Sequence, residues 1–151
     1  MRGGIAILAL ALAACGAGSG EGLDENGQPL PGDSGGGNLA PPVPGLAPTL
    51  ASIQANVFSV NCAVPGCHGG VGAQQGLRLD PGFSAGSLIN VASTQDATLV
   101  RVIPGNPGGS FLIHKLEGTQ TVGFQMPSGG PYLPQSTIDV IRQWIQDGAP
   151  Q

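Results

Sequence analysis

The stretch at residues 61–70, NCAVPGCHGG, brings together side chains that could bind a cofactor. Cys62, Cys67 and His68 lie within seven residues of one another, in a chain with three Cys and two His in total. A c-type haem is attached by thioether bonds from two cysteines to the porphyrin vinyl groups, and the histidine after the second cysteine binds the iron. The usual pattern is Cys-x-x-Cys-His. Here the Cys-His pair is intact, and a four-residue spacer that contains Pro and Gly must bulge to let both thiols reach the porphyrin.

Two other chemistries fit the same residues. A disulfide between Cys62 and Cys67 would close a short loop in an exported protein, with His68 merely adjacent. A copper site could use His68, Met126 and a cysteine thiolate, because soft sulfur ligands suit Cu(I). The residues of this stretch alone leave the haem, disulfide and copper interpretations open.

Met126 is the candidate for the second axial ligand of a haem iron. A thioether opposite a histidine raises the reduction potential, and Met126 lies in a stretch rich in Pro and Gly that is typical of a loop. Its alternative role is to fill a gap in the core, as many methionines do. His114 is the competing distal ligand, and its apolar neighbours favour a surface or half-buried structural histidine instead.

The first fifteen residues are expected to be a targeting segment. An apolar run at residues 5–14 is too short to span a bilayer and suits a secretion signal. The run ends in LAAC, which resembles the lipobox of bacterial lipoproteins, whose cysteine (here Cys15) carries the lipid. We therefore expect a lipoprotein anchored in the cell envelope, on the periplasmic side or at the outer membrane, with two thiols left to explain.

Composition divides the rest of the chain. Residues 16–48 contain ten Gly and six Pro among 33 residues with only acidic charges, and they are expected to form a disordered tether. Residues 49–151 are expected to form one domain. Its four basic and five acidic residues make no basic patch, which argues against nucleic acid as a partner.

Two amphipathic helices should bracket this domain. The first is capped by Thr49 and repeats apolar residues at three- and four-residue steps. The second starts near residues 134–136, with Asp139 in its first turn. Residues 86–91 and 97–102 are weaker helix candidates. The apolar stripes of the two main helices consist of Leu50, Ile53, Val57 and Val60, with Phe58 beside them, and of Ile138, Ile141, Trp144 and Ile145.

Few aromatic residues are available to organise the many loops between these helices. The chain has four Phe, one Trp and one Tyr against 27 Gly and 14 Pro. Loop-rich scaffolds of this kind usually depend on a disulfide, a metal or a prosthetic group. The composition therefore indicates that something other than side chains fills part of the core.

Several short motifs occur in an order that resembles a known family. They are CHGG at 67–70, GLRLD at 76–80, VIPGNP at 102–107, MP at 126–127 and IRQWIQDGAP at 141–150. Together they resemble the single-haem, cytochrome c-like domains of bacterial envelope proteins, including the planctomycete-type cytochrome c family. The resemblance covers about residues 50–150, and the wide cysteine spacing is its mismatch.

The resemblance implies an all-α, cytochrome c-like fold with short helices and long loops around one haem c, and with the first and last helices packed together. It implies Cys62 and Cys67 as haem attachment points, His68 as the proximal ligand and Met126 as the distal ligand of the iron. The expected function is a membrane-anchored electron carrier with a redox partner protein. The alternatives are a disulfide-stapled interaction lipoprotein without cofactor and a periplasmic copper-binding protein.

An enzyme is the least favoured class. No Ser/His/Asp or paired-carboxylate arrangement is visible in the sequence, so no catalytic residue is assigned. A haem with an open distal side could react with peroxide, and this possibility rises if Met126 does not bind the iron.

Overall fold

The structure, a computed structural model, describes residues 40, 41 and 43–151. The expected signal segment, the lipid attachment at Cys15 and residues 16–39 of the expected tether lie outside the described residues. Within the described part of the chain, no helix has the length and the apolar content that crossing a membrane requires.

The described chain contacts the domain already before Thr49. The Ala40 N–H donates to the Tyr132 carbonyl at 2.7 Å, and Leu46 packs against the hydrophobic core. Thr49 itself caps the first helix as predicted, because its extended backbone turns its Oγ1 to accept a hydrogen bond from the Ser52 N–H at 3.3 Å.

The first helix changes its winding after one turn. It begins as the α-helix α1 (Leu50–Ile53) and continues as the π-helix η1 (Gln54–Cys62). In a π-helix each hydrogen bond spans five residues instead of four, so the residues that share one face lie further apart along the chain. Val60, predicted to lie in the apolar stripe, is instead 62% exposed, because that prediction assumed α-helical winding throughout.

The C-terminal helix α4 (Gln135–Gln146) matches the prediction closely. Its predicted apolar stripe is buried; the four residues are Ile138, Ile141, Trp144 and Ile145. The Trp144 indole N–H donates to the Pro150 carbonyl at 2.9 Å, which ties the end of the chain back onto the helix. Asp139 lies beyond the first turn, contrary to prediction, because the helix starts at Gln135, whose Nε2 donates to the Asp139 carboxylate at 2.9 Å.

A third helix, α3 (Phe111–Glu117), was not predicted and packs against α4. Its Phe111, Ile113 and Leu116 are buried. Arg142 of α4 joins it through a bidentate pair with Glu117, in which Nε and Nη2 each lie 2.8 Å from a carboxylate oxygen.

The segment between the outer helices is mostly loop. The short helix α2 (Ser84–Leu88) overlaps the weaker candidate at 86–91, whereas the candidate at 97–102 is not helical. Residues 97–99 form a turn, and the following Val100 and Val102 form isolated bridges to Ala92 and Ile89. These two β-branched residues suit an extended backbone. Two short 3₁₀ turns, η2 (Gln74–Gly76) and η3 (Pro107–Gly109), complete the elements.

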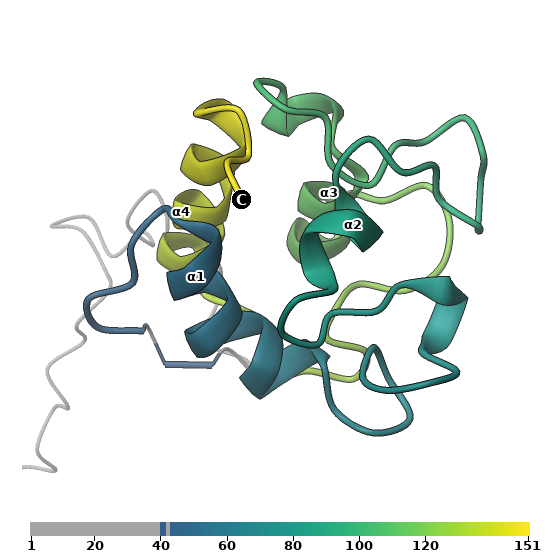
Figure 1. Ribbon diagram of the computed structural model, residues 1–151, viewed down its shortest axis with the longest axis horizontal. Helices are drawn as coiled ribbons and strands as arrows, with labels where there is room; N and C mark the ends of the chain where they lie inside the picture. The colour runs from purple at the N-terminus through teal and green to yellow at the C-terminus, as the bar shows by residue number, and fades with distance from the viewer. Residues whose placement is uncertain (1–39, 42) are drawn as a thin grey trace, which may run out of the picture. The chain divides into compact units, whose positions relative to one another are not determined.

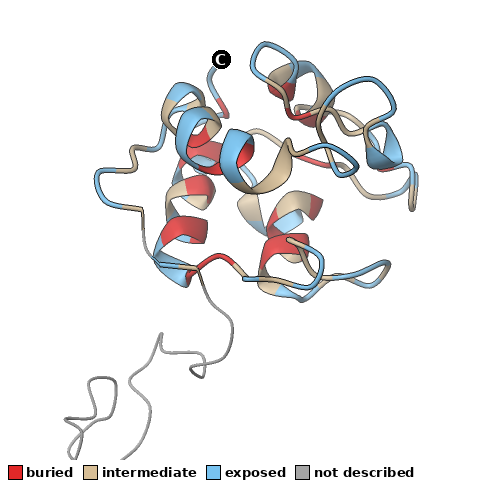
Figure 2. Cartoon of the chain, turned by 90° about the horizontal axis from the view of Figure 1, so that it is seen from below, coloured by how far each residue is buried: buried red, intermediate tan, exposed pale blue. Residues whose placement is uncertain are grey.

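The described residues form helices joined by long loops, without a strand longer than an isolated bridge. In Figure 1, the loops of the middle segment lie on the side of the domain away from α1 and α4. Residues of α1, η1, α2, α3 and α4 share one hydrophobic cluster. The helix faces that turn inward are buried, and the loops are largely exposed or intermediate (Figure 2).

Candidate haem site

A cavity of about 560 Å³ lies among the loops of the middle segment. This volume falls within the roughly 300–1,000 Å³ that is usual for small-molecule and cofactor sites. The four residues that the sequence analysis assigned to the site all line it, namely Cys62, Cys67, His68 and Met126. Apolar walls come from residues of several elements, among them Leu77, Leu88, Phe111 and Leu112.

The spacer between the two cysteines folds into a tight turn. The Cys67 N–H donates to the Val64 carbonyl at 3.0 Å, with Pro65 and Gly66 at the two central positions and Gly66 at a φ of 83°. Proline followed by a glycine with positive φ is the requirement of a type II turn. The longer spacer is thus taken up by a turn, and both cysteines still reach the same cavity.

Both cysteines are free thiols in the structure. Cys62, at the end of η1, is packed against the hydrophobic core, whereas Cys67 is exposed. Burial, and to a smaller extent the neighbouring Cys67, raises the pKa of the Cys62 thiol to about 12. Cys62 therefore remains a protonated thiol at neutral pH.

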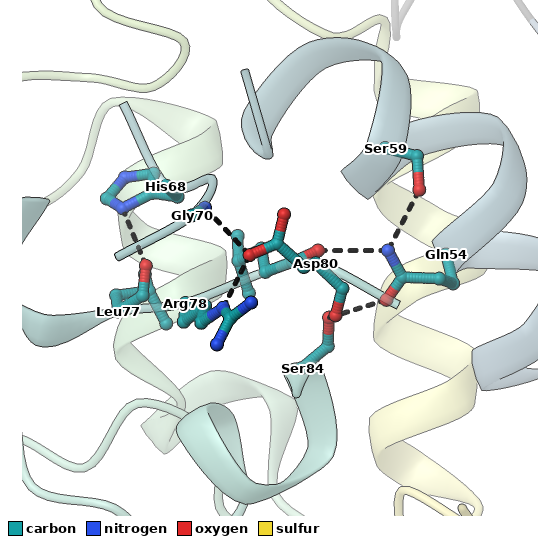
Figure 3. A network of polar contacts seen from close by, with 9 residues as sticks. Gln54, Ser59, His68, Gly70, Leu77, Arg78, Asp80 and Ser84 are labelled. Carbon is teal, nitrogen blue, oxygen red and sulfur yellow. Dashed lines mark hydrogen bonds and ion pairs between the residues drawn. The ribbon is translucent and has the colours of Figure 1, made fainter. Parts of the chain in front are cut away.

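The ring of His68 is oriented by backbone carbonyls. Its Nδ1 lies 3.1 Å from the Leu77 carbonyl oxygen and 3.2 Å from that of Gln74, so Nδ1 carries the proton and donates it to these acceptors (Figure 3). The lone pair is then on Nε2, on the other side of the ring, which is the arrangement that metal-binding histidines usually have. Burial lowers the pKa of His68 and outweighs the two hydrogen bonds that act in the opposite direction. The imidazole is therefore neutral near pH 7, as an iron ligand must be.

We call residues 62–80 the histidine loop. Its backbone is closed by hydrogen bonds within the loop, from the His68 N–H to the Cys62 carbonyl at 3.0 Å and from the Leu79 N–H to the His68 carbonyl at 2.8 Å. The Asp80 carboxylate accepts from the Gly70 N–H at 2.8 Å and from Arg78 Nε at 2.6 Å (Figure 3). The loop that holds His68 is therefore held largely by its own residues.

The histidine loop is also attached to the first helix. Gln54 of η1 donates from Nε2 to the Leu79 carbonyl at 2.9 Å and accepts a hydrogen bond from Ser84 of α2 at its Oε1 (Figure 3). This amide therefore joins η1, the end of the histidine loop and α2.

Met126 lies in a second loop, residues 119–134, which we call the methionine loop. The Met126 N–H donates to the Lys115 carbonyl of α3 at 2.8 Å, and the half-buried Met126 packs against the hydrophobic core. Lys115 also binds the loop through its ammonium group, which donates to the Val122 carbonyl at 2.8 Å and to that of Phe124 at 3.3 Å. Gln125 Nε2 also donates to the Leu116 carbonyl at 3.0 Å, so the methionine loop is attached to α3 through Lys115 and Gln125.

His114, the competing distal ligand, is not among the residues that line the cavity. Its Nδ1 lies 2.9 Å from Thr119 Oγ1 and its Nε2 lies 3.0 Å from the Gly108 carbonyl oxygen. Both ring nitrogens therefore have partners in a structural role, and Met126 is the better placed of the two candidates.

Two cavity residues were missed by the sequence analysis. Arg101 and Lys115 line the cavity, and each is only 7% exposed. The available signal was local: each cation stands between apolar residues, in VRV at 100–102 and in LIHKL at 112–116. A cation within an apolar run is a candidate for burial, and buried cations normally have a partner.

The donor set fits a haem. One neutral imidazole and one thioether could bind the iron, two thiols could serve as attachment points, and the apolar walls suit a porphyrin. Within the described ranges, no group of three or more His, Cys, Asp and Glu side chains is placed to hold a metal ion by itself. Comparisons with family models, with curated proteins and with solved structures found no match for this chain.

Proposed function

We propose that this protein is a c-type cytochrome, a monohaem electron carrier tethered to the cell envelope through Cys15. One observation carries the proposal: the four residues that the sequence assigns to haem attachment and ligation line a single cavity. Cys62, Cys67 and His68 share one short stretch, whereas Met126 comes from a separate loop, so the approach of Met126 to the other three depends on the fold. The iron, when present, would take up and release one electron, and the protein would set its ligands, its dielectric surroundings and its access to solvent.

In this proposal His68 and Met126 have complementary roles. The neutral His68, held through Nδ1, presents Nε2 to the iron, and the Met126 thioether is the second ligand and raises the reduction potential. Cys62 and Cys67 would hold the porphyrin by addition of each S–H group across a vinyl group, in which the S–H bond and the C=C π bond give way to a C–S and a C–H bond without an oxidant or reductant. This reaction requires two reduced thiols, which is the state of both residues in the structure.

The test is a pyridine haemochrome spectrum of the full chain made in a host with a cytochrome c maturation system. We expect an α band of the two-thioether type and a mass gain of one haem. The variants Cys62→Ser and Cys67→Ser should each shift the α band toward that of a haem that retains one vinyl group. His114→Ala serves as the matched control for the single-residue changes, because His114 lies away from the cavity.

A colourless and folded protein from that host would contradict the proposal. Non-reducing mass analysis of the same sample would then separate the alternatives. A Cys62–Cys67 disulfide would favour the interaction lipoprotein, and retained copper that is lost in Met126→Ala would favour the copper-binding protein.

A further inference from the structure

The charges around the cavity differ from those of the chain as a whole. The protein has a net charge of −4, but neither Asp nor Glu is among the residues that line the cavity, whereas Arg101 and Lys115 both are. The ion pairs within the described residues are Arg78–Asp80 and Arg142–Glu117, and neither includes a cavity cation. Two buried cations therefore face an apolar cavity without a carboxylate partner.

Hydrogen bonds to backbone carbonyls satisfy each of these cations only in part. Arg101 donates from Nη1 to the Ser87 and Gly76 carbonyls at 2.8 and 3.4 Å, and from Nη2 to the Gln75 carbonyl at 2.7 Å. A guanidinium has five N–H donors, so Nε and one Nη2 proton remain available.

The Lys115 ammonium has three N–H donors and uses two of them, on the Val122 and Phe124 carbonyls. It is also enclosed on a further side, because a Cβ on Gly123 would overlap its Nζ. The Phe111 ring also lies near this ammonium, with its centre 5.1 Å from Nζ. Each cation is thus fixed in place by neutral groups and has no carboxylate partner among the described residues.

Burying an unpaired charge is costly, and the usual remedy is an opposite charge. Burial lowers the pKa of both Arg101 and Lys115, which is the sign of this cost. A ligand that brings anionic groups into the cavity would remove it. The ligand that this cavity suits therefore has a large apolar body and acidic substituents.

Building on the proposed function, we propose that Arg101 and Lys115 form a seat for the two acidic side chains of the porphyrin. The two cations recognise the carboxylates through charge-assisted hydrogen bonds, independently of the cysteine, histidine and methionine residues. They therefore decide which porphyrins the cavity accepts and how strongly it holds them before attachment.

The test compares two iron porphyrins that differ only at the acidic groups. Iron mesoporphyrin lacks vinyl groups and cannot attach to the cysteines, and its dimethyl ester lacks both carboxylates as well. Each is titrated, in the same detergent buffer, into the full chain made without a maturation system, and binding is followed by the shift of the Soret band. Because a charge-assisted hydrogen bond contributes more than a neutral one, we expect the diacid to bind about tenfold or more tightly than the ester.

Variants then assign the difference to the two cations. In Lys115→Met and Arg101→Met, the ratio of diacid affinity to ester affinity should fall, because any loosening of the loops weakens both porphyrins alike, whereas the lost cation weakens only the diacid. Arg142→Met is the matched control, because Arg142 pairs with Glu117 and does not line the cavity, and it should retain the full preference. The comparison on the unmodified chain requires no substitution, so it remains valid even if a variant fails to fold.

The outcomes separate this inference from the proposed function. Equal binding of the diacid and the ester would overturn the acidic seat while leaving haem binding in place. Binding of neither porphyrin would overturn both. A preference for the diacid that survives in both cavity variants would also overturn the assignment to Arg101 and Lys115.

Discussion

The histidine loop and the methionine loop face the same cavity but are held in place in different ways. Most hydrogen bonds of the histidine loop join its own carbonyls and N–H groups, and the Asp80 carboxylate accepts from Gly70 and Arg78 within the same loop. The methionine loop relies on α3, from which Lys115 binds it at three points, through one carbonyl and two ammonium hydrogen bonds.

This difference implies different behaviour before a haem is bound. This loop can keep His68 in position without a ligand, because the carbonyls that orient the His68 ring belong to the loop itself. The methionine loop keeps Met126 in position only as long as α3 and Lys115 are in place. We therefore expect the histidine side to be formed first and the methionine side to be the more easily released.

The largest effect should come from removing the ligand on the preformed side. His68→Ala should lower the haem content of the matured protein by about tenfold or more, because no other imidazole lines the cavity. The measurement is the ratio of haem to protein by pyridine haemochrome. His114→Ala should keep the haem content of the unmodified protein, and an equal loss in both variants would contradict the assignment of His68.

Removing the ligand on the other side should alter the iron without releasing it. Met126→Ala should retain haem but lower the reduction potential by an amount on the order of 0.1 V, a fraction of the roughly 0.8 V that axial ligands span in haem proteins. Potentiometric titration measures this change. Met126→Leu keeps most of the packing and should show the same fall, so an unchanged potential in Met126→Leu would indicate that Met126 only fills space.

Lys115→Met should loosen the methionine loop selectively. Two part-buried carbonyls lose a charged donor, so we expect the free energy of unfolding to fall by about 2 kcal/mol. Urea unfolding measures the total, and hydrogen exchange should show faster exchange in the methionine loop than in the histidine loop. Arg142→Met, which breaks a part-exposed ion pair, should cost about 1 kcal/mol or less. Equal loosening of both loops would contradict the comparison.

The smallest effect should come from replacing Asp80, whose carboxylate binds Gly70 and Arg78 in the histidine loop. The Arg78 side chain, together with the Gly70 N–H, holds the pKa of Asp80 below its ordinary value of 3.8. The contribution of this carboxylate to stability is therefore present above about pH 4 and is lost as the pH falls below that value. The thermal unfolding midpoint of the unmodified protein should fall between pH 5 and pH 3. In Asp80→Asn this fall should be smaller by about a degree or two.

The control for this measurement is Asp96→Asn. Hydrogen bonds from Thr98 also lower the pKa of Asp96, but this residue lies outside the histidine loop. Hydrogen exchange at low pH should therefore change in the histidine loop for Asp80→Asn and not for Asp96→Asn. Unchanged exchange in both variants would show that the hydrogen bonds of Asp80 do not stabilise the histidine loop.

The sequence predicted those elements whose stabilisation is local. The Thr49 cap and the apolar stripe of α4 are confirmed, because a capping hydroxyl and a four-residue apolar pattern act within one helix. The prediction that Val60 is buried was wrong, because the apolar residues of this segment are compatible with both α-helical and π-helical winding. The sequence does not show which hydrogen bonds form. Residues 97–102 were a helix candidate from the sequence and are not helical, because the bridges of Val100 and Val102 depend on residues about ten positions away.

The site was predictable only as far as it depends on distinctive side chains. Cysteine, histidine and methionine are rare in this chain, so their positions drew attention, and the structure brings them to one cavity. The carbonyls of Gln74 and Leu77 that orient His68 leave no trace in the sequence, because every residue has such an acceptor. The apolar neighbours of Arg101 indicate burial, but only the structure shows that Arg101 lines the same cavity as His68.

The π-helical winding of η1 also sets the direction in which its last residue points. Cys62 is nine residues beyond the buried Ile53, which is about two and a half turns of an α-helix and would leave the thiol on the opposite face. With the wider turn of about four to five residues, the same nine residues make close to two full turns, and the thiol returns to the buried side. The winding of the helix therefore sets the direction of the Cys62 side chain, and removal of one residue from η1 would rotate this thiol away from the cavity.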